Sequence, residues 1–394
     1  MAAATQHWFE PELSDPPVPE VSPSFAGEGE ARAWFVRERA NLLAALEAAH
    51  RFRLDALTCE FAATLGPIYI AASTVDDLRR AGELGLVSAE RTDDSVAYAN
   101  MLSVLAEADR ASGDFESALA RFRQVCALYQ AAGDTERHLR TVNGIGLIHL
   151  ERRELDHALS HFSDVLDLAC ANGMELWAAV ARDNLAATHK EAGRLDPAAA
   201  LAHQALDTYQ NVGIDRWVLA TPLLHLACIH RETAQFDLAE QFLARAEKAL
   251  PNPDAYLTTA CAILLERAAL AEATGNHEQA NNTYWQCVHI QRPLGHRARE
   301  ATAYSGLGRV LTRLGQPEAA SDFHRQALAL RRLLPNRFLL ATTLADLAET
   351  LDACGAGQDA EACRAEAYEL LVDTMDPRAQ RLRSDITALR TGPR

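Results

Sequence analysis

A spacing of about 40 residues between small side chains constrains the fold of this chain more than any other feature. Within residues 140–168, Gly146 and Ala158 lie in two amphipathic runs that the polar pair Arg153 and Glu154 separates. The first small position recurs in steps of 40 or 41 residues at Gly66, Ala106, Gly146, Ala186, Ala227, Ala268, Gly308 and Ala348. The second recurs in the same steps at Leu78, Ala118, Ala158, Ala198, Ala239, Ala280, Ala320 and Ala360. Two amphipathic runs joined by a tight turn predict a helical hairpin, and the fixed period predicts an array of hairpins.

Small residues are needed at both positions because paired helices pack with their axes about 8–10 Å apart. The fold class that we predict is therefore all-α, a right-handed α-solenoid of about eight helical hairpins. We expect an acidic, proline-rich leader at 1–29, an opening helix at 30–51, the repeat array at 52–375, and a capping helix with a tail at 376–394.

The two ends of the array should differ from its middle. In the first hairpin, Pro67 is expected to end or kink the first helix, and Gly82 and Gly85 to interrupt the second. An open solenoid also needs a cover at its last repeat. The residues spaced to provide it are Leu382, Ile386 and Leu389.

Composition excludes several classes of function. The net charge of −16 argues against a general nucleic-acid binder, because binding phosphates requires a basic face. No apolar run reaches the roughly 18 residues of a membrane span, and the first residues do not resemble a signal peptide. We therefore expect a cytoplasmic protein without membrane or direct nucleic-acid contacts, and 36 arginines against two lysines favour a high-GC bacterial origin. The cysteines lack CxxC or metal-finger spacing and should be buried thiols: Cys59, Cys126, Cys170, Cys228, Cys261, Cys287, Cys354 and Cys363.

No motif for catalysis or cofactor binding stands out. A P-loop requires a glycine before its lysine, and neither Lys190 nor Lys248 follows one. There is no GxSxG, and the carboxylates are spread over helix surfaces. We therefore expect a protein that is not an enzyme and has no cofactor. Two Gly-x-Gly pairs lack the strand and the third glycine of a dinucleotide site and should be packing positions: Gly144 with Gly146, and Gly306 with Gly308.

Five histidines raise the question of a metal site. His149, His189 and His230 occupy one position in three successive repeats, about 10 Å apart by helix diameter, whereas zinc ligands converge at about 2 Å from one ion. Core filling is the predicted role of these three. His157 and His161 could share a helix face as paired ligands do, but no HExxH and no third ligand accompanies them. We predict no metal site.

The repeat pattern resembles that of tetratricopeptide repeats, with small-x-x-aromatic/His in the first helix and Ala-x-x-x-aromatic-x-x-Ala in the second. Those repeats usually span 34 residues, so a longer period implies longer helices. Residues 33–49, AWFVRERANLLAALEAA, are similar to the segment that opens the helical-repeat region of AfsR-type (SARP and NB-ARC) transcriptional regulators. There the repeats follow a winged-helix DNA-binding domain and a nucleotide-binding domain and receive a signal or partner. The resemblance implies a free-standing sensor or adaptor, or a fragment of a longer regulator.

The resemblance also implies where a partner binds, because the first helix of each tetratricopeptide pair lines the inner groove. The groove residues that we select on this basis, with Arg299 near the rim, are Asn143, Asp183, Lys190, Arg231, Arg299, Ser305, Arg309 and Arg313. The Lys and Asn pair by which some family members clamp a C-terminal carboxylate is not reproduced. We therefore do not expect chaperone-tail binding.

Charge is distributed unevenly. Between Arg292 and Arg337, nine arginines stand against three acidic residues. This basic region is interpreted either as a surface for an anionic partner, centred on Arg309 and Arg313, or as a solvated face of arginines paired with neighbouring glutamates.

The function that we predict is a non-catalytic module that binds a protein, a peptide or an anionic segment, with a small-molecule effector as a further partner. The resemblance implies a regulatory or signal-sensing role linked to transcription. The alternatives are a small-molecule-binding enzyme or biosynthetic accessory protein on the same scaffold, and a static assembly scaffold.

Overall fold

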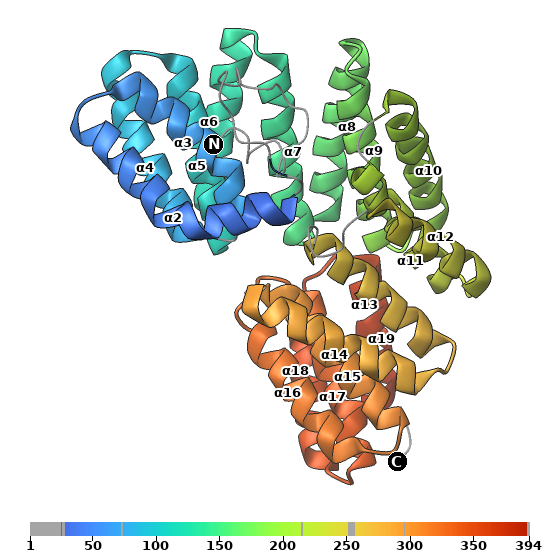
Figure 1. The fold of residues 1–394 in the computed structure, drawn as a ribbon. Helices are drawn as coiled ribbons and strands as arrows, with labels where there is room; N and C mark the ends of the chain where they lie inside the picture. The colour runs from blue at the N-terminus through green and yellow to red at the C-terminus, as the bar shows by residue number, and fades with distance from the viewer. Residues whose placement is uncertain are drawn as a thin grey trace. The chain divides into compact units, whose positions relative to one another are not determined.

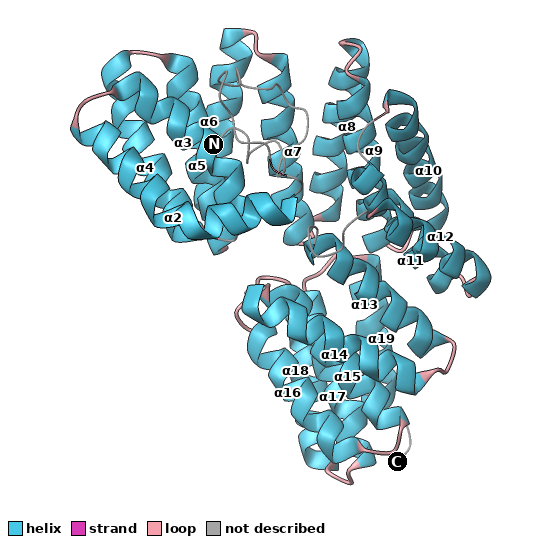
Figure 2. Cartoon of the chain, viewed as in Figure 1, coloured by secondary structure: helices cyan, strands magenta, loops and turns pink. Residues whose placement is uncertain are grey.

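The computed structural model describes residues 25, 28–71, 74–213, 216–250, 257–294 and 296–391 (Figure 1). Within these ranges the regular structure consists of eighteen α-helices and one short 3₁₀ helix, without strands (Figure 2). The predicted all-α fold class is therefore confirmed. Of the predicted leader at 1–29, all but residues 25, 28 and 29 lies outside the described residues.

The helices form two compact units, an N-terminal unit that reaches to Ile148 and a C-terminal unit that begins at His149. The N-terminal unit contains α2 (Glu28–Arg51), α3 (Asp55–Ala71), α4 (Val75–Thr92), α5 (Ser95–Ser112), α6 (Phe115–Ala132) and most of α7 (Thr135–Glu151). The C-terminal unit contains α8 (Leu155–Ala171), α9 (Glu175–Glu191), α10 (Leu195–Val212), η1 (Arg216–Leu219), α11 (Ala220–Glu232), α12 (Phe236–Ala249), α13 (Leu257–Ala273), α14 (His277–Leu294), α15 (Arg297–Arg313), α16 (Pro317–Arg331), α17 (Arg337–Ala353), α18 (Gly357–Leu370) and α19 (Pro377–Thr391).

The small positions of the repeat explain how the helices are placed. The first position falls in α3 and then in every second helix up to α17, and the second position falls in the helix that follows each of these. All sixteen residues at these positions are buried, and Leu78 and the seven alanines at the second position are fully inaccessible. Their spacing therefore marks the lines along which neighbouring helices approach closely.

Two glycines of α15 show how close that approach is. A Cβ added at Gly306 would lie 2.3 Å from the Tyr284 ring, and one added at Gly308 would lie 2.4 Å from the His324 ring. Both rings are buried. The prediction that this Gly-x-Gly pair serves helix packing is confirmed.

The expected helix end at Pro67 and the expected interruption at Gly82 and Gly85 are wrong. The helix α3 continues through Pro67, and α4 continues through Gly82 and Gly85. The two glycines instead make room for α5, because a Cβ at Gly85 would lie 2.1 Å from Met101 Sδ and one at Gly82 2.8 Å from Leu105. Packing against buried neighbours has outweighed local helix propensity here.

The turn between α7 and α8 contains a strained arginine. Arg153 has a φ of 59°, whereas glycine holds the equivalent turn positions 193, 275, 315 and 355. Its side chain donates from Nε to Asp376 over 2.5 Å and from Nη1 to Glu191 over 2.7 Å, and its guanidinium lies 4.1 Å from the Phe338 ring centroid. Arg153 thus ties three distant segments of the C-terminal unit together, and these contacts offset the cost of its backbone conformation.

The helix α19 packs on the last hairpin through Ile386 and Leu382, which join a cluster with Leu347 and Leu371. Leu389, expected to share in this cover, is instead 68% exposed. The neighbouring Arg390 bonds Glu361 and lies over the Tyr368 ring, so ionic and cation–π contacts hold this end of the helix.

The described cysteines are all free thiols. Cys59, Cys261 and Cys287 are buried as expected, whereas Cys170 is exposed, which makes the expectation wrong at that position. No described helix combines the length and the apolar character that crossing a bilayer demands.

Candidate functional site

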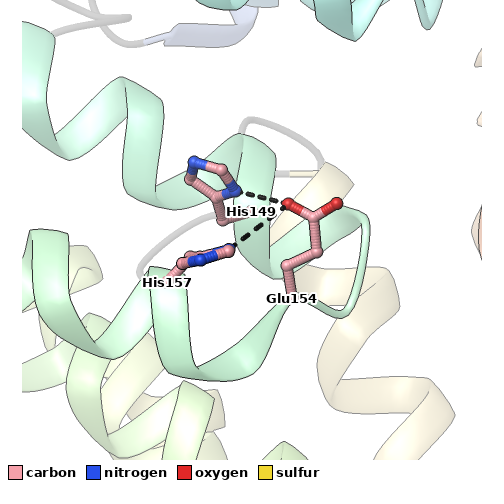
Figure 3. A group of neighbouring side chains, drawn as sticks. All are labelled: His149, Glu154 and His157. Carbon is pink, nitrogen blue, oxygen red and sulfur yellow. Dashed lines mark hydrogen bonds and ion pairs between the residues drawn. The ribbon is translucent and has the colours of Figure 1, made fainter. Parts of the chain in front are cut away.

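Two of the repeated histidines, His149 and His230, contact side chains in the turns that follow them. His149 is buried, and its Nδ1 lies 2.6 Å from Glu154 Oε2 (Figure 3). His230 makes the same contact, with its Nδ1 2.9 Å from Gln235 Oε1. At these two positions the imidazole therefore contacts the residue that precedes the next helix. The sequence offered no third ligand beside His157, but the structure brings His149, Glu154 and His157 together.

A larger site lies in the C-terminal unit, where a cavity of about 520 Å³ opens along three successive first helices. Alanines and a leucine of α13 form its apolar wall, and charged side chains surround them. The lining residues are Arg231, Ala262, Leu265, Glu266, Ala269, Glu272, Ala273, Tyr284, Thr302, Arg309 and Arg313.

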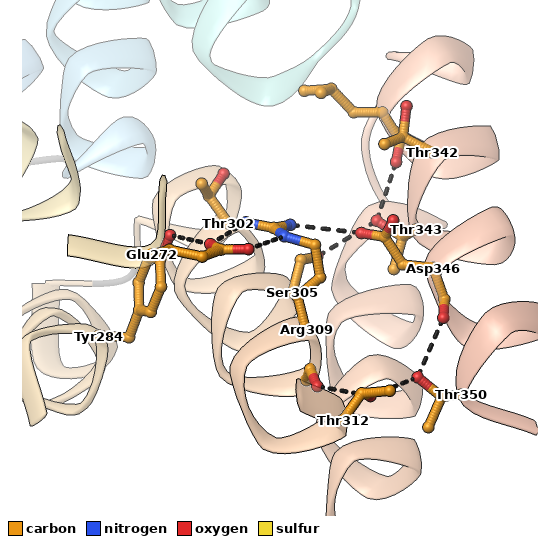
Figure 4. Close-up of polar contacts among 12 residues, drawn as sticks. Glu272, Tyr284, Thr302, Ser305, Arg309, Thr312, Thr342, Thr343, Asp346 and Thr350 are labelled. Carbon is orange, nitrogen blue, oxygen red and sulfur yellow. Dashed lines mark hydrogen bonds and ion pairs between the residues drawn. The ribbon is translucent and has the colours of Figure 1, made fainter. Parts of the chain in front are cut away.

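Glu272 is the centre of the polar part of this cavity, and 8% of its surface is exposed. Arg309 donates to both carboxylate oxygens, from Nε over 2.9 Å and from Nη2 over 3.0 Å. The Tyr284 hydroxyl donates over 3.0 Å (Figure 4). Arg313 Nη1 donates over 3.1 Å. Four donor atoms therefore satisfy one buried carboxylate, which is the condition for burying a charge without a large penalty.

Arg309 also contacts the next hairpin. Its Nη1 donates to Asp346 Oδ2 over 3.3 Å, so one guanidinium joins α13, α15 and α17 (Figure 4). Hydroxyls continue this junction, with Ser305 3.3 Å from Thr343. Side-chain polar contacts thus join α15 to α17 as well as to α13.

The pKa values of the two carboxyl groups beside Arg309 are shifted in opposite directions. Burial raises the pKa of Glu272, but the hydrogen bonds and the charge of Arg309 outweigh it, so the pKa lies below its ordinary value. Burial also raises the pKa of Asp346, and there the single bond from Arg309 does not compensate. Glu272 is therefore the firmly ionised partner of Arg309.

A second ion pair stands on the α11 side of the cavity. Arg231 Nε donates to Glu266 Oε1 over 2.5 Å. Burial alone would lower the pKa of Arg231, but the Glu266 carboxylate raises it. Three guanidiniums and two carboxylates thus line the cavity, which leaves one positive charge in excess.

The structure brings three of the sequence-selected groove residues to this cavity, namely Arg231, Arg309 and Arg313. Lys190 lies on α9, 3.7 Å from Glu191, and Ser305 is buried against α17. The remaining three do not line the cavity: Asp183, which contacts His225 over 3.1 Å, Arg299, which is half-buried in the first turn of α15, and Asn143, which belongs to the N-terminal unit.

The sequence did not single out the acidic partners. Glu266 and Asp346 each stand two residues before the small position of their repeat, and Glu272 stands four after it. That register was available from the sequence. The signal that could have identified them is the recurrence of acids near this position in repeats that neighbour Arg231 and Arg309.

Comparison with known proteins identifies the repeat. Residues 178–212 and 259–333 match the tetratricopeptide repeat family. No curated protein matches the chain significantly.

Several solved structures are similar. A Rap protein complexed with competence and sporulation factor is 12% identical, with 84% of this chain and 98% of that chain covered and a TM-score of 0.56. The apo form of RapI is 11% identical, with 77% and 84% covered and a TM-score of 0.57. BtubC (BKLC) from P. vanneervenii is 23% identical over 61% of this chain and 95% of that chain, with a TM-score of 0.43. The chain thus contains tetratricopeptide repeats and has the helical-repeat fold of the Rap proteins.

Proposed function

We propose that this chain is a non-catalytic binding module that recognises a peptide or a short protein segment in the cavity of its C-terminal unit and acts in regulation. The observation that carries this proposal is the cavity itself, about 520 Å³ with an apolar wall and paired charges. Ligand sites in proteins commonly enclose about 300–1,000 Å³ and combine apolar walls with a few fixed polar groups.

The chemistry of the lining supports recognition over catalysis. General acid–base catalysis needs a group whose pKa lies near the working pH. Arginine stays protonated in proteins, the pKa of Glu272 lies below its ordinary value, and burial raises the pKa of Tyr284. These groups can hold a ligand, but they are poorly suited to exchanging protons with it near neutral pH.

Arg313 is the residue that we assign to an acidic group of the ligand. Half of its side chain is exposed, and its one described hydrogen bond goes to Glu272. The excess positive charge of the lining favours such a group. Fold similarity to a Rap protein whose structure contains a bound factor supports a peptide ligand, and the similarity of residues 33–49 to AfsR-type regulators supports a link to transcription.

The test is selection from a library of random heptapeptides, followed by fluorescence anisotropy with the peptides recovered. Arg313→Glu reverses the charge at the exposed edge of the cavity and should weaken binding at least tenfold. Arg325→Glu is the matched control, because Arg325 is similarly exposed but pairs with Asp322 on α16, outside the cavity. Equal affinities for wild type and Arg313→Glu, in variants with unchanged circular dichroism, would refute the assignment.

A small anionic effector is the second candidate, because the volume of the cavity also suits a metabolite. Thermal-shift screening with anionic metabolites addresses it with the same pair of variants. Stabilisation of wild type and Arg325→Glu, but not of Arg313→Glu, would assign the cavity to a small ligand.

A further inference from the structure

The turn after His149 differs from the equivalent turns at two positions whose side chains can bind a metal ion. Five residues after the histidine, the repeats have Glu154, Arg194 and Gln235, and three residues further they have His157, Pro197 and Leu238. The start of α8 thus combines a carboxylate with a second imidazole. The equivalent segments of the next two repeats have neither.

These three side chains converge. Their ligand atoms all lie within 4.8 Å of one another, the one such group of three among the residues that the structure describes. His157 Nδ1 lies 3.9 Å and His149 Nδ1 2.6 Å from the same atom, Glu154 Oε2 (Figure 3). The residues come from the end of α7, the turn, and the first turn of α8, so the backbone holds all three in place.

The orientation of Glu154 is the second observation. Asp114 stands at the equivalent position one repeat earlier and accepts the backbone N–H of Ser117, as helix-capping residues do. Glu154 makes no such capping bond. Its Oε1 accepts from Arg152 Nε over 2.8 Å, which leaves Oε2 directed at the two imidazoles. Outer-sphere bonds of this kind orient carboxylate ligands in metal sites.

We propose that His149, Glu154 and His157 bind a divalent transition-metal ion of the Zn²⁺ class. Two imidazoles and one carboxylate are a common ligand set for this ion. Ligand bonds of about 2.0–2.1 Å place tetrahedral ligand atoms roughly 3.3 Å apart. To reach this spacing, the distance from His149 Nδ1 to Glu154 Oε2 must increase and that from His157 Nδ1 must decrease, each by less than about 1 Å. His157 is 72% exposed, so the remaining position of the ion faces solvent.

The stacked ring of His161 is not part of the proposed site. Its centroid lies 5.3 Å from that of His149, and Phe242 stacks on His230 in the same way over 5.2 Å. A phenylalanine is therefore compatible with this stacked position, which makes His161→Phe a matched control.

The experiment is calorimetric titration with Zn²⁺ in a Cys170→Ser background, because Cys170 is an exposed thiol that could bind zinc. The parent should bind one equivalent that His157→Ala and Glu154→Gln lose and His161→Phe keeps. Glu154→Gln should fold normally, since the His230 and Gln235 pair shows this contact with an amide. Absence of that equivalent in the parent, or its retention in both His157→Ala and Glu154→Gln, would overturn the proposal.

Discussion

At the scale of single residues, the environment of Arg309 shows that one cation can treat two carboxylates differently. Glu272 receives four donor atoms from Arg309, Arg313 and Tyr284, and Asp346 receives one side-chain donor. Burial raises the pKa of both carboxyl groups, and the number of donors decides whether the net shift is upward or downward. Contact with the same arginine therefore does not imply equal ionisation.

Glu272→Gln should destabilise the protein by about 1–3 kcal/mol at about pH 7, because the amide loses charge-assisted bonds. The folded pKa of Glu272 lies below its ordinary value of 4.5, so this contribution is complete above that pH and is lost as the pH falls through the folded value. Urea denaturation of wild type and variant should therefore give a constant difference between about pH 7 and pH 5 that shrinks in more acidic solution.

Asp346→Asn is the control for this experiment. The pKa of Asp346 is raised, so its ionised form is less favourable in the folded protein than in the unfolded chain, and removing that charge relieves a cost. Asp346→Asn should therefore lower the free energy of unfolding by clearly less than Glu272→Gln does. A larger loss for Asp346→Asn would contradict the roles given to the two carboxylates.

Arg309 and Arg313 could be assigned to a groove from the sequence, because the resemblance to tetratricopeptide repeats implies that the first helix of each pair lines it. The repeat positions of their acidic partners could also be read from the sequence, but the contacts with those partners could not. Glu272 and Asp346 stand 37 residues away on either side of Arg309, and contact across repeats depends on the rotation between hairpins. The sequence pattern sets the spacing of helices but leaves that rotation open.

At the scale of helices, the sequence carried most of the information. Small residues recur where helices touch, and their period located the helices of both units. The errors came from rules about isolated residues. The helix-breaking tendency of Pro67 and Gly85 is local, and burial of the surrounding side chains was sufficient to override it.

Gly308→Ala tests the close approach of helices. The added methyl group would meet the buried His324 ring, so we expect a loss of about 1–3 kcal/mol in unfolding free energy. Gly357→Ala is the matched control, because it also lies in a helix but has no neighbouring atom within 4 Å. That variant should be as stable as wild type or up to about 1 kcal/mol more stable. Equal effects in thermal unfolding would show that packing at α15 is looser than described.

At the scale of the whole molecule, the C-terminal unit is closed by contacts that sequence proximity does not suggest. Arg153 and Asp376 are 223 residues apart, and Arg378 donates to Glu232 across 146 residues. The two contacts join the start of α19 and the residue before it to the turn after α7 and to the end of α11. The repeat period could not predict them, since it describes neighbours only.

Arg153→Met should loosen this closure, because it leaves the buried Asp376 carboxylate without its main cation. Loss of one partner of a buried ion pair costs about 3–5 kcal/mol. Amide hydrogen exchange in α19 should therefore accelerate. Arg332→Met, which removes an exposed pair with Glu366, should leave exchange unchanged. Protection of α19 that survives Arg153→Met would show that apolar packing alone holds the helix.

The pairing of Arg309 has a mechanical consequence. Its guanidinium bonds to side chains of the preceding and the following hairpin. The charges around it therefore influence how firmly these three hairpins are held together. An acidic ligand at Arg313 would compete with Glu272 for the Arg313 guanidinium and so change the charges around this junction. If ligand binding changes the free energy of separating these hairpins, separating them must change the free energy of ligand binding by the same amount.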